Sequence, residues 1–412
     1  MRYYTLQIMT KHKTDILRIL QEHTLCDSCL GRLMKHHLPQ PMANRERGET
    51  LRSQYTETSN SSLEQCSLCE GLCDEISHFA DLVADELQEY EYSTFLIGCV
   101  VDDDILQKEH ALWESYNIEN PESIKTEIHR EIGKLLEPRL QKTVVFEHPD
   151  IHVIIDTRFD VLTLQIKPVY LYGRYQKLQR DIPQTTWHCR ICRGVGCRVC
   201  NFTGQQYPLS VEEAIGEWAI KLTNAKEAIL HGAGREDIDA LMVGEGRPFV
   251  LEIKHPHLRT IDLHQLEQHV NKDFDKKVQV HKLRWSTKEE IARLKQASFR
   301  KIYRITIEGK TPFIKEKLKE VAQILPGTTI QQFTPTRVAH RRAQKNRSRT
   351  IYQCTVESIA KTSAVLTLET ESGTYVKEFV SGDEGRTQPN LSELLDIPCT
   401  VTQLDVIDVK GE

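Results

Sequence analysis

Residues 231–256 read HGAGREDIDALMVGEGRPFVLEIKHP and form the most informative stretch of this chain. Glycines and charged residues come first, and RPFVLEIK then has the dense apolar content of a buried strand. The charged residues are therefore expected on a loop between a helix and a strand, where catalytic groups are commonly carried. From the residues alone, Asp237 is either a reactive carboxylate or part of a salt bridge that caps a turn.

The region around this loop, residues 205–412, alternates helix and strand patterns. Ser210 and Glu213 form a capping box, which predicts a helix from Val211 to Leu230. Strand patterns such as YRITIEG, YQCTVESI and SAVLTLET follow, together with the helical pattern STKEEIARLKQ. These patterns predict a single α+β domain.

A second α/β pattern precedes it in residues 81–187. The strand TFLIGCVVD is followed by the helical stretch ESIKTEIHREIGKLLEPRL and then by the strands IHVIID and LTLQIKPVYLYG. This order is typical of a small independent α/β domain.

The first 80 residues contain two Cys-x-x-Cys pairs. Four thiolates at this spacing predict a closed, structural zinc site, which stabilises a segment too short to build its own core. Cys73 is interpreted as a packing residue, and four reduced core cysteines are the alternative. The predicted ligands are Cys26, Cys29, Cys66 and Cys69.

A second cysteine group lies in residues 188–204, which are predicted to form a hinge. Two glycines in CRICRGVGCRVC let the loop fold back over one metal ion, so a second zinc is possible here. A redox dithiol is the alternative, although no thioredoxin-like pattern surrounds it. The four thiols are Cys189, Cys192, Cys197 and Cys200.

Bulk composition bounds the remaining questions. A length of 412 residues suggests two or three domains. No apolar window is long enough to cross a bilayer and no secretory signal pattern begins the chain, so a cytoplasmic protein is expected.

The net charge is −5, yet residues 334–349 form a basic run without an acid, which indicates either a phosphate-binding surface or a solvated loop. Its members are Arg337, His340, Arg341, Arg342, Lys345, Arg347 and Arg349.

Several long motifs in the same order carry a family resemblance. GREDIDALMVGEGRPF resembles the signature of the Pus-ten family, the THUMP-domain tRNA pseudouridine synthases of archaea and eukaryotes. RKIYRI, TPTRVAHRRA, SGTYVKEFVSGDEGRTQPNL and GRYQKLQRDIPQTTWHC are similar to further blocks of that family. The resemblance implies a zinc module and a THUMP-like α/β domain, followed by a pseudouridine-synthase domain with a mixed sheet.

The resemblance also implies roles for individual residues. Asp237 would be the nucleophile, Tyr303 the ring that packs on the target base, and Lys377 the basic partner of the carboxylate. Arg235, Val376 and Leu404 would complete the substrate pocket. Arg174 is expected among the RNA contacts, together with the basic run.

The expected reaction is the isomerisation of uridine to pseudouridine, and the resemblance implies positions 54 and 55 of the tRNA T-loop. tRNA is the expected partner of a monomer that needs no nucleotide cofactor, membrane or catalytic metal. One alternative is a non-catalytic THUMP and zinc adaptor that only binds tRNA. Another is a THUMP methyltransferase or thiouridine synthase, but the glycine-rich nucleotide loop of such enzymes is not found in the sequence.

Overall fold

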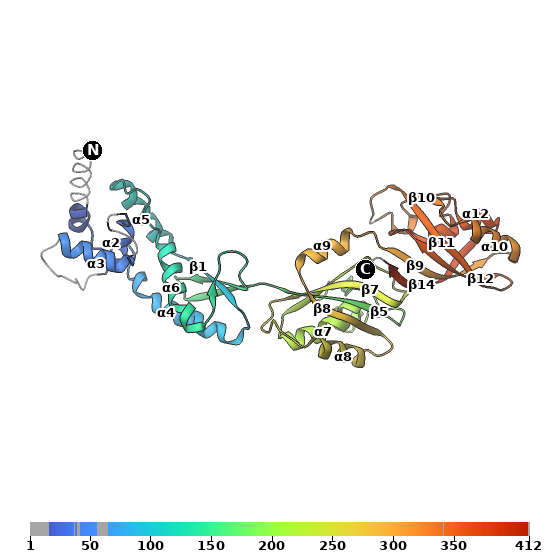
Figure 1. Cartoon of the computed structure of the whole chain (residues 1–412), viewed down its shortest axis with the longest axis horizontal. Helices are drawn as coiled ribbons and strands as arrows, with labels where there is room; N and C mark the ends of the chain where they lie inside the picture. The colour runs from blue at the N-terminus through green and yellow to red at the C-terminus, as the bar shows by residue number, and fades with distance from the viewer. Residues whose placement is uncertain (1–15, 37, 39–41, 56–64, 341, 411–412) are drawn as a thin grey trace. The chain divides into compact units, whose positions relative to one another are not determined.

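The computed structural model describes residues 16–36, 38, 42–55, 65–340 and 342–410, and the chain divides into two compact units (Figure 1). The first unit is Met1–Lys167 and the second is Pro168–Glu412. Each unit has its own hydrophobic core. Among the described residues, no helix is both long enough and apolar enough to span a membrane.

The domain boundary predicted at residue 187 is corrected to Lys167/Pro168. The strand Val169–Lys177 (β5) pairs with two strands of the second unit and is buried along nearly its whole length. Its two neighbours, β7 and β8, both belong to the second unit, so β5 is an interior strand of the large sheet of that unit. The predicted hinge, residues 188–204, consequently lies inside the second unit.

The first unit contains a four-stranded sheet with the order β2-β1-β3-β4. β1 is parallel to both β2 and β3, and β4 is antiparallel to β3. Helix α6 begins at Ser123, whose hydroxyl accepts the Thr126 N–H, and its apolar face packs on β1. The elements are α2 (Asp27–Leu33), α3 (Asn44–Tyr55), α4 (Ile76–Glu86), β1 (Thr94–Val100), α5 (Asp103–Ser115), α6 (Ile124–Leu140), β2 (Thr143–Val144), β3 (Ile151–Asp156) and β4 (Val161–Ile166), with 3-10 turns η1 (Leu72–Asp74) and η2 (Leu87–Glu89).

The second unit is built on a ten-stranded mixed sheet with the order β13-β10-β11-β12-β9-β14-β7-β5-β8, in which β6 also pairs with β7. Most pairs are antiparallel, but β14 runs parallel to β7. The strands besides β5 are β6 (Glu227–Gly232), β7 (Leu241–Lys254), β8 (Val278–Ser286), β9 (Arg300–Gly309), β10 (Thr329–Phe333), β11 (Asn346–Ile359), β12 (Ser363–Thr370), β13 (Thr387–Gln388) and β14 (Cys399–Lys410).

Short helices cover this sheet: α7 packs on β6 and α8 on β8 in one half, and α10 packs on β11 in the other (Figure 1). Ser210 is the N-cap, as predicted, because its hydroxyl accepts the Glu213 N–H and also donates to the Glu213 carboxylate. The helix ends at Thr223, earlier than predicted, since Asn224 adopts a left-handed conformation and β6 follows. The helical elements are α7 (Val211–Thr223), α8 (Leu263–Asp273), α9 (Lys288–Gln296), α10 (Lys315–Ile324), α11 (Val376–Ser381) and α12 (Leu391–Leu395), with 3-10 turns η3 (Arg198–Cys200) and η4 (Thr336–Val338).

Candidate active site

The Asp237 loop, residues 233–240, leads into the strand β7, as predicted, but it follows the strand β6 and not the predicted helix. Gly234 has φ +83°, and a Cβ there would come within 3.0 Å of the Lys301 amine, so the turn favours glycine. At the far end of the loop, the Leu241 N–H donates to the Asp405 carboxylate on β14 over 3.1 Å. The loop is thus fixed at the point where β7 and β14 run side by side.

The loop opens onto a cleft of about 710 Å³. The six predicted catalytic and pocket residues all line it, although they come from the loop, from β9 and β14, and from helix α11. Those residues are Arg235, Asp237, Tyr303, Val376, Lys377 and Leu404.

Asp237 offers its carboxylate to the cleft with 40% of the side chain exposed. The Lys377 amine lies 3.3 Å from Asp237 Oδ2 and 3.1 Å from Asp239 Oδ2. Burial opposes ionisation of Asp239, but the hydrogen bond and charge of Lys377 outweigh it and bring the pKa of Asp239 below its ordinary value. The amine of Lys377 therefore lies within ion-pair distance of two carboxyl groups at the mouth of the cleft.

Tyr303 lies on β9 beneath the loop and is buried. Burial raises the pKa of Tyr303 to about 12, and the nearby Asp237 charge adds to the effect against the opposing charge of Arg247. The phenol is therefore neutral at physiological pH. Val376 and Leu404 add apolar surface to the same cleft.

A buried polar network that sequence reasoning missed supports the loop from behind. Glu236 and Arg247 form an ion pair of 2.8 Å with side chains 0% and 1% exposed. The Tyr175 hydroxyl donates to the Glu236 carboxylate over 3.0 Å and accepts from Gln184 Nε2 over 2.8 Å. Arg247 also donates to the Ala233 carbonyl over 2.8 Å, which ties β7 to the start of the loop.

Lys177 holds the other end of the loop. Its buried amine donates to the carbonyls of Ile182, Asp237 and Ile238 over 2.9, 3.1 and 3.1 Å. Burial lowers the pKa of this lysine. The backbone of Asp237 is thus bonded to the scaffold while its carboxylate faces solvent.

Lys301 is a further buried cation of the cleft wall. Burial lowers its pKa to about 8, and the adjacent charge of Arg247 acts in the same direction. No pattern in RKIYRI distinguishes this lysine from an exposed strand residue, so its burial was not predictable.

The basic run is divided by the structure. Arg337 Nε donates to Glu378 over 2.6 Å and its NH1 lies 3.6 Å from Asp237 Oδ2, so this residue belongs to the charge set around Asp237. His340 and Lys345 are exposed, and Arg341 lies outside the described residues. Arg342, Arg347 and Arg349 line the cleft together with Arg337.

The predicted RNA contact at Arg174 is corrected. The side chain is 5% exposed and donates to the carbonyls of Glu245, Gly246 and Val409 over 2.6, 2.8 and 3.0 Å. These bonds tie β5 to β7 and β14 and leave the guanidinium shielded from a phosphate. Arg174 is therefore a structural residue of the sheet.

The first cysteine group differs from the prediction by one member. The sulfurs that lie within 4.8 Å of one another belong to Cys26, Cys29, Cys69 and Cys73, so the prediction of Cys66 as fourth ligand and Cys73 as packing is corrected. Gly71, at φ +94°, turns the chain so that Cys73 comes back within 4.0 Å of Cys29, whereas the sulfur of Cys66 accepts the Cys26 N–H.

The second group, Cys189, Cys192, Cys197 and Cys200, is gathered as predicted, with sulfur–sulfur distances of 3.8 to 3.9 Å. A tetrahedron of thiolates about 2.3 Å from a zinc ion has edges of about 3.8 Å, and a disulfide needs about 2.05 Å. Both groups of four thiols therefore fit a tetrahedral metal ion, and all these cysteines are free.

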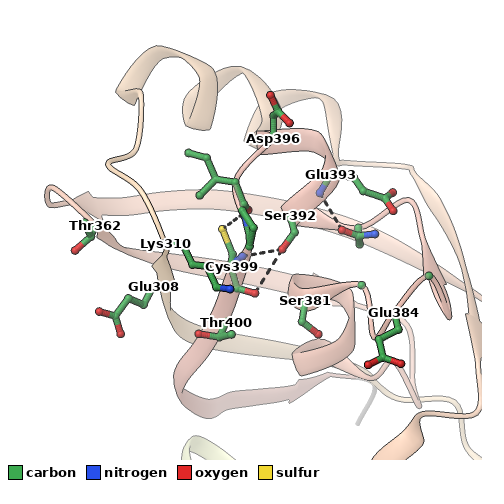
Figure 2. A pocket seen from close by; sticks show the side chains of 16 residues that line it. Glu308, Lys310, Thr362, Ser381, Glu384, Ser392, Glu393, Asp396, Cys399 and Thr400 are labelled. Carbon is green, nitrogen blue, oxygen red and sulfur yellow. Dashed lines mark hydrogen bonds between the residues drawn. The ribbon is translucent and has the colours of Figure 1, made fainter.

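A second pocket of about 850 Å³ lies at the start of β14 (Figure 2). Its floor is ordered by Ser392, whose hydroxyl accepts the Cys399 N–H over 2.9 Å. Four carboxylates line it and Lys310 is the one basic residue among its lining groups, so its field repels a polyanion and the Asp237 cleft is the better site for RNA. The acids are Glu308, Glu384, Glu393 and Asp396.

Comparison with known proteins agrees with this geometry. Residues 170–410 match the family described as "Pus10, C-terminal", and residues 79–156 match "Pus10 THUMP domain, archaeal". Proteins named tRNA pseudouridine synthase Pus10 are 37% identical in Halorubrum lacusprofundi (97% of both chains), 38% in Methanothrix thermoacetophila (96% of this chain, 94% of the relative) and 40% in Archaeoglobus fulgidus (84% and 95%).

Among solved structures, a chain of a Cbf5-Nop10-Gar1 complex is 14% identical over 47% of this chain and 43% of its own, with a TM-score of 0.31, which is too low to support an argument. The family match covers more than half of the chain, and the identity with the relatives extends over nearly all of it. The chain therefore belongs to the Pus10 family.

Proposed function

We propose that this tRNA pseudouridine synthase isomerises the uridines at positions 54 and 55 of the tRNA T-loop, with Asp237 as the nucleophile. The observation that carries the proposal is an accessible carboxylate held by Lys377 beside the buried ring of Tyr303. In the reaction, the glycosidic C–N bond breaks, the uracil rotates, and a C–C bond joins it again to the ribose. The isomerisation needs no redox partner.

Each group of the cleft has a physical task in that reaction. A base must leave its stack to reach Asp237, and the ring of Tyr303 offers it a stacking face. Lys377 and Arg337 oppose the desolvation that would otherwise neutralise Asp237 when RNA closes the cleft. Val376 and Leu404 exclude water from the uracil.

Extrusion of a base costs a few kcal/mol, which contacts elsewhere on the tRNA must offset. Arg342, Arg347 and Arg349 at the cleft, with Lys345 and His340 beyond it, contact phosphates of the modified arm. Such contacts position the RNA without reading its sequence. The THUMP unit holds the acceptor-stem side of the same tRNA.

Zn²⁺ is the ion proposed for both cysteine groups, because four thiolates in a closed tetrahedron suit it. The metal would cross-link segments that have little secondary structure of their own. Neither group lies among the residues that line the cleft, so its role is structural.

The experiment that tests the function compares Asp237→Asn with Asp239→Asn on a tRNA transcript. Both changes keep the side-chain shape and remove one charge paired with Lys377. Pseudouridine at positions 54 and 55 is expected to form at least about a thousandfold more slowly with Asp237→Asn, whereas Asp239→Asn retains most activity. Equal losses of activity in the two variants would contradict the assignment of Asp237 as the nucleophile. A wild type that binds tRNA without isomerising uridine would instead indicate a non-catalytic adaptor.

Tyr303 is tested by a pair of substitutions. Tyr303→Phe keeps the ring and is expected to retain part of the activity, because stacking requires only the ring face. Tyr303→Ala removes the face and is expected to lose nearly all turnover while tRNA binding persists. Equal losses in both variants would assign the role to the hydroxyl.

A further inference from the structure

The second cysteine group lies at the tip of a small hairpin, residues 187–207, here called the knuckle. Its two strands meet through backbone bonds from Gln206 to Trp187 and from Cys189 to Gly204, of 2.8 and 2.7 Å, on either side of the His188–Gln205 bridge. Beyond this neck, the thiols are the main groups that gather the chain. The knuckle is thus a compact arm with a defined base.

The base of the knuckle is part of the cleft wall. Trp187 lines the cleft, and the guanidinium of Arg235 lies over its ring at 5.1 Å from the centroid. The Trp187 ring also meets Tyr207 edge-on at 5.5 Å, where the chain returns from the knuckle. Any strand of RNA whose uridine reaches Asp237 therefore passes close to Trp187, where the knuckle joins the cleft wall.

The tip of the knuckle carries a charge that suits RNA. Residues 182–211 contain three arginines and no acid. Arg190, Arg193 and Arg198 are exposed, and none of their side chains forms a hydrogen bond or an ion pair with any residue that the structure describes. Three exposed guanidinium groups therefore lie on an arm whose first residue, Trp187, lines the cleft, and they add positive charge to this part of the molecule.

The same tip exposes apolar side chains that do nothing for folding. Val195 is 90% and Phe202 72% exposed, and Ile191 and Val199 are nearly as open. Phe202 moreover has φ +62°, a left-handed conformation that a bulky residue rarely adopts. Phe202 therefore buries little apolar surface in the folded chain although its backbone is strained, which makes it a candidate binding residue.

We propose that the knuckle is a second RNA-binding element, in which Arg190, Arg193 and Arg198 contact phosphates and Phe202 stacks on an unpaired base of the strand that flanks the target uridine. This inference rests on the proposed function, because the cleft must receive a uridine. RNA is favoured over a protein partner because charge, exposed rings and continuity with the cleft point to one polyanion with stacking faces. Together with Tyr303, the knuckle would hold two bases at once.

The first test measures tRNA affinity against salt for the triple variant Arg190→Gln, Arg193→Gln, Arg198→Gln. Each lost phosphate contact is expected to reduce the slope of log affinity against log salt by about 0.7 to 0.9. The matched control is Lys315→Gln, Lys317→Gln, Lys319→Gln on α10, which removes the same charge from residues that do not line the cleft. An unchanged slope in the arginine variant, or an equal change in the control, would overturn the inference.

The second test is Phe202→Gly, which separates binding from stability. Glycine adopts the left-handed conformation without strain and the lost ring was exposed, so thermal stability is expected to stay equal or to rise. Affinity for tRNA, and for an isolated T-arm hairpin, is expected to fall at least about fivefold. Unchanged affinity for both RNAs would show that the ring binds something else, and a loss confined to whole tRNA would contradict its place beside the target.

The activity of the wild type distinguishes a failure of the knuckle proposal from a failure of the proposed function. A wild type that forms pseudouridine while all knuckle variants bind normally would remove only the knuckle from the mechanism. A wild type without isomerisation would instead remove the proposed function itself.

Discussion

The Asp237 loop and the knuckle are two irregular segments of one cleft that are ordered in opposite ways. The loop is bonded from behind by two buried cations of the sheet, Arg247, which pairs with Glu236 of the loop, and Lys177, which donates to loop carbonyls. The knuckle offers almost no buried side chain and is gathered by four thiols. The loop therefore depends on the integrity of the whole sheet, whereas the knuckle depends on a local cross-link.

Because of this difference, substitutions in the two segments are expected to affect the stability of the sheet to different extents. Buried charges couple the position of Asp237 to the stability of the scaffold, since an unpaired buried ion is expensive. A thiol cluster at an exposed tip can open without exposing the core. Four changes test this contrast.

The largest effect is expected for Arg247→Met, which leaves Glu236 buried without its partner. The free energy of unfolding of the second unit is expected to fall by about 3–5 kcal/mol. Arg304→Met is the control, because its 2.8 Å pair with Glu357 is largely exposed and is worth about 1 kcal/mol or less. Urea denaturation followed by tryptophan fluorescence measures both, and similar midpoints would contradict a scaffold-held loop.

Lys301→Met is expected to stabilise the fold, and to do so in a pH-dependent way. Burial lowers the pKa of Lys301 from 10.5 to about 8, so the cost of its buried charge is fully present below pH 8 and disappears as pH rises toward 10.5. The gain over wild type is expected to reach about 3 kcal/mol at pH 7 and to shrink by pH 10. A gain that does not change with pH would mean that only packing has improved.

Tyr175→Phe removes the hydroxyl between Glu236 and Gln184 without changing the ring. A loss of about 1–3 kcal/mol is expected, because the buried partners keep their polar atoms without that bond. Tyr352→Phe is the control of the same chemistry, because Tyr352 is a half-buried residue of β11 whose hydroxyl forms no hydrogen bond with any residue that the structure describes. Equal denaturation midpoints would show that the network behind the loop contributes little.

The smallest effect on the sheet is expected when the knuckle loses its thiols. Cys192→Ser with Cys197→Ser is expected to change the free energy of unfolding of the sheet by no more than about 0.5 kcal/mol, because neither residue belongs to the core of the second unit. Amide hydrogen exchange within residues 187–207 is expected to rise strongly at the same time. The double variant Cys26→Ser with Cys29→Ser is expected to destabilise the first unit, because Cys29 is buried in its core and Cys26 packs against that core. A knuckle variant that unfolds the sheet would contradict the difference between the two segments.

The cleft residues were predictable where the chemistry leaves a local pattern. Asp237, Tyr303 and Lys377 occur in motifs that resemble a family, and the fold brings them together as expected. The supporting residues were not predictable. Glu236 and Arg247 are charged residues of types that are usually exposed, and nothing in the local sequence indicates that the fold buries them.

Three predictions were wrong because they depended on tertiary contacts that leave no local pattern in the sequence. The stretch VYLYGRYQK was assigned to the wrong unit, because the sequence of a buried strand does not indicate which strands it pairs with. Arg174 lies within it and was predicted to contact RNA, but the fold buries its side chain. The choice between Cys66 and Cys73 likewise depends on a turn at Gly71 that the spacing of thiols does not encode.

The place of β14 in the sheet has a consequence for how the protein is made. β14 follows all other strands in the chain, yet it lies between β9 and β7 and joins the two halves of the sheet. During synthesis, at roughly 5–20 residues per second, the half that contains β5 and β7 waits on the order of ten seconds for its neighbour. Tyr303 and Asp237 are brought to one cleft only when that strand inserts, so an incompletely translated chain has no assembled active site.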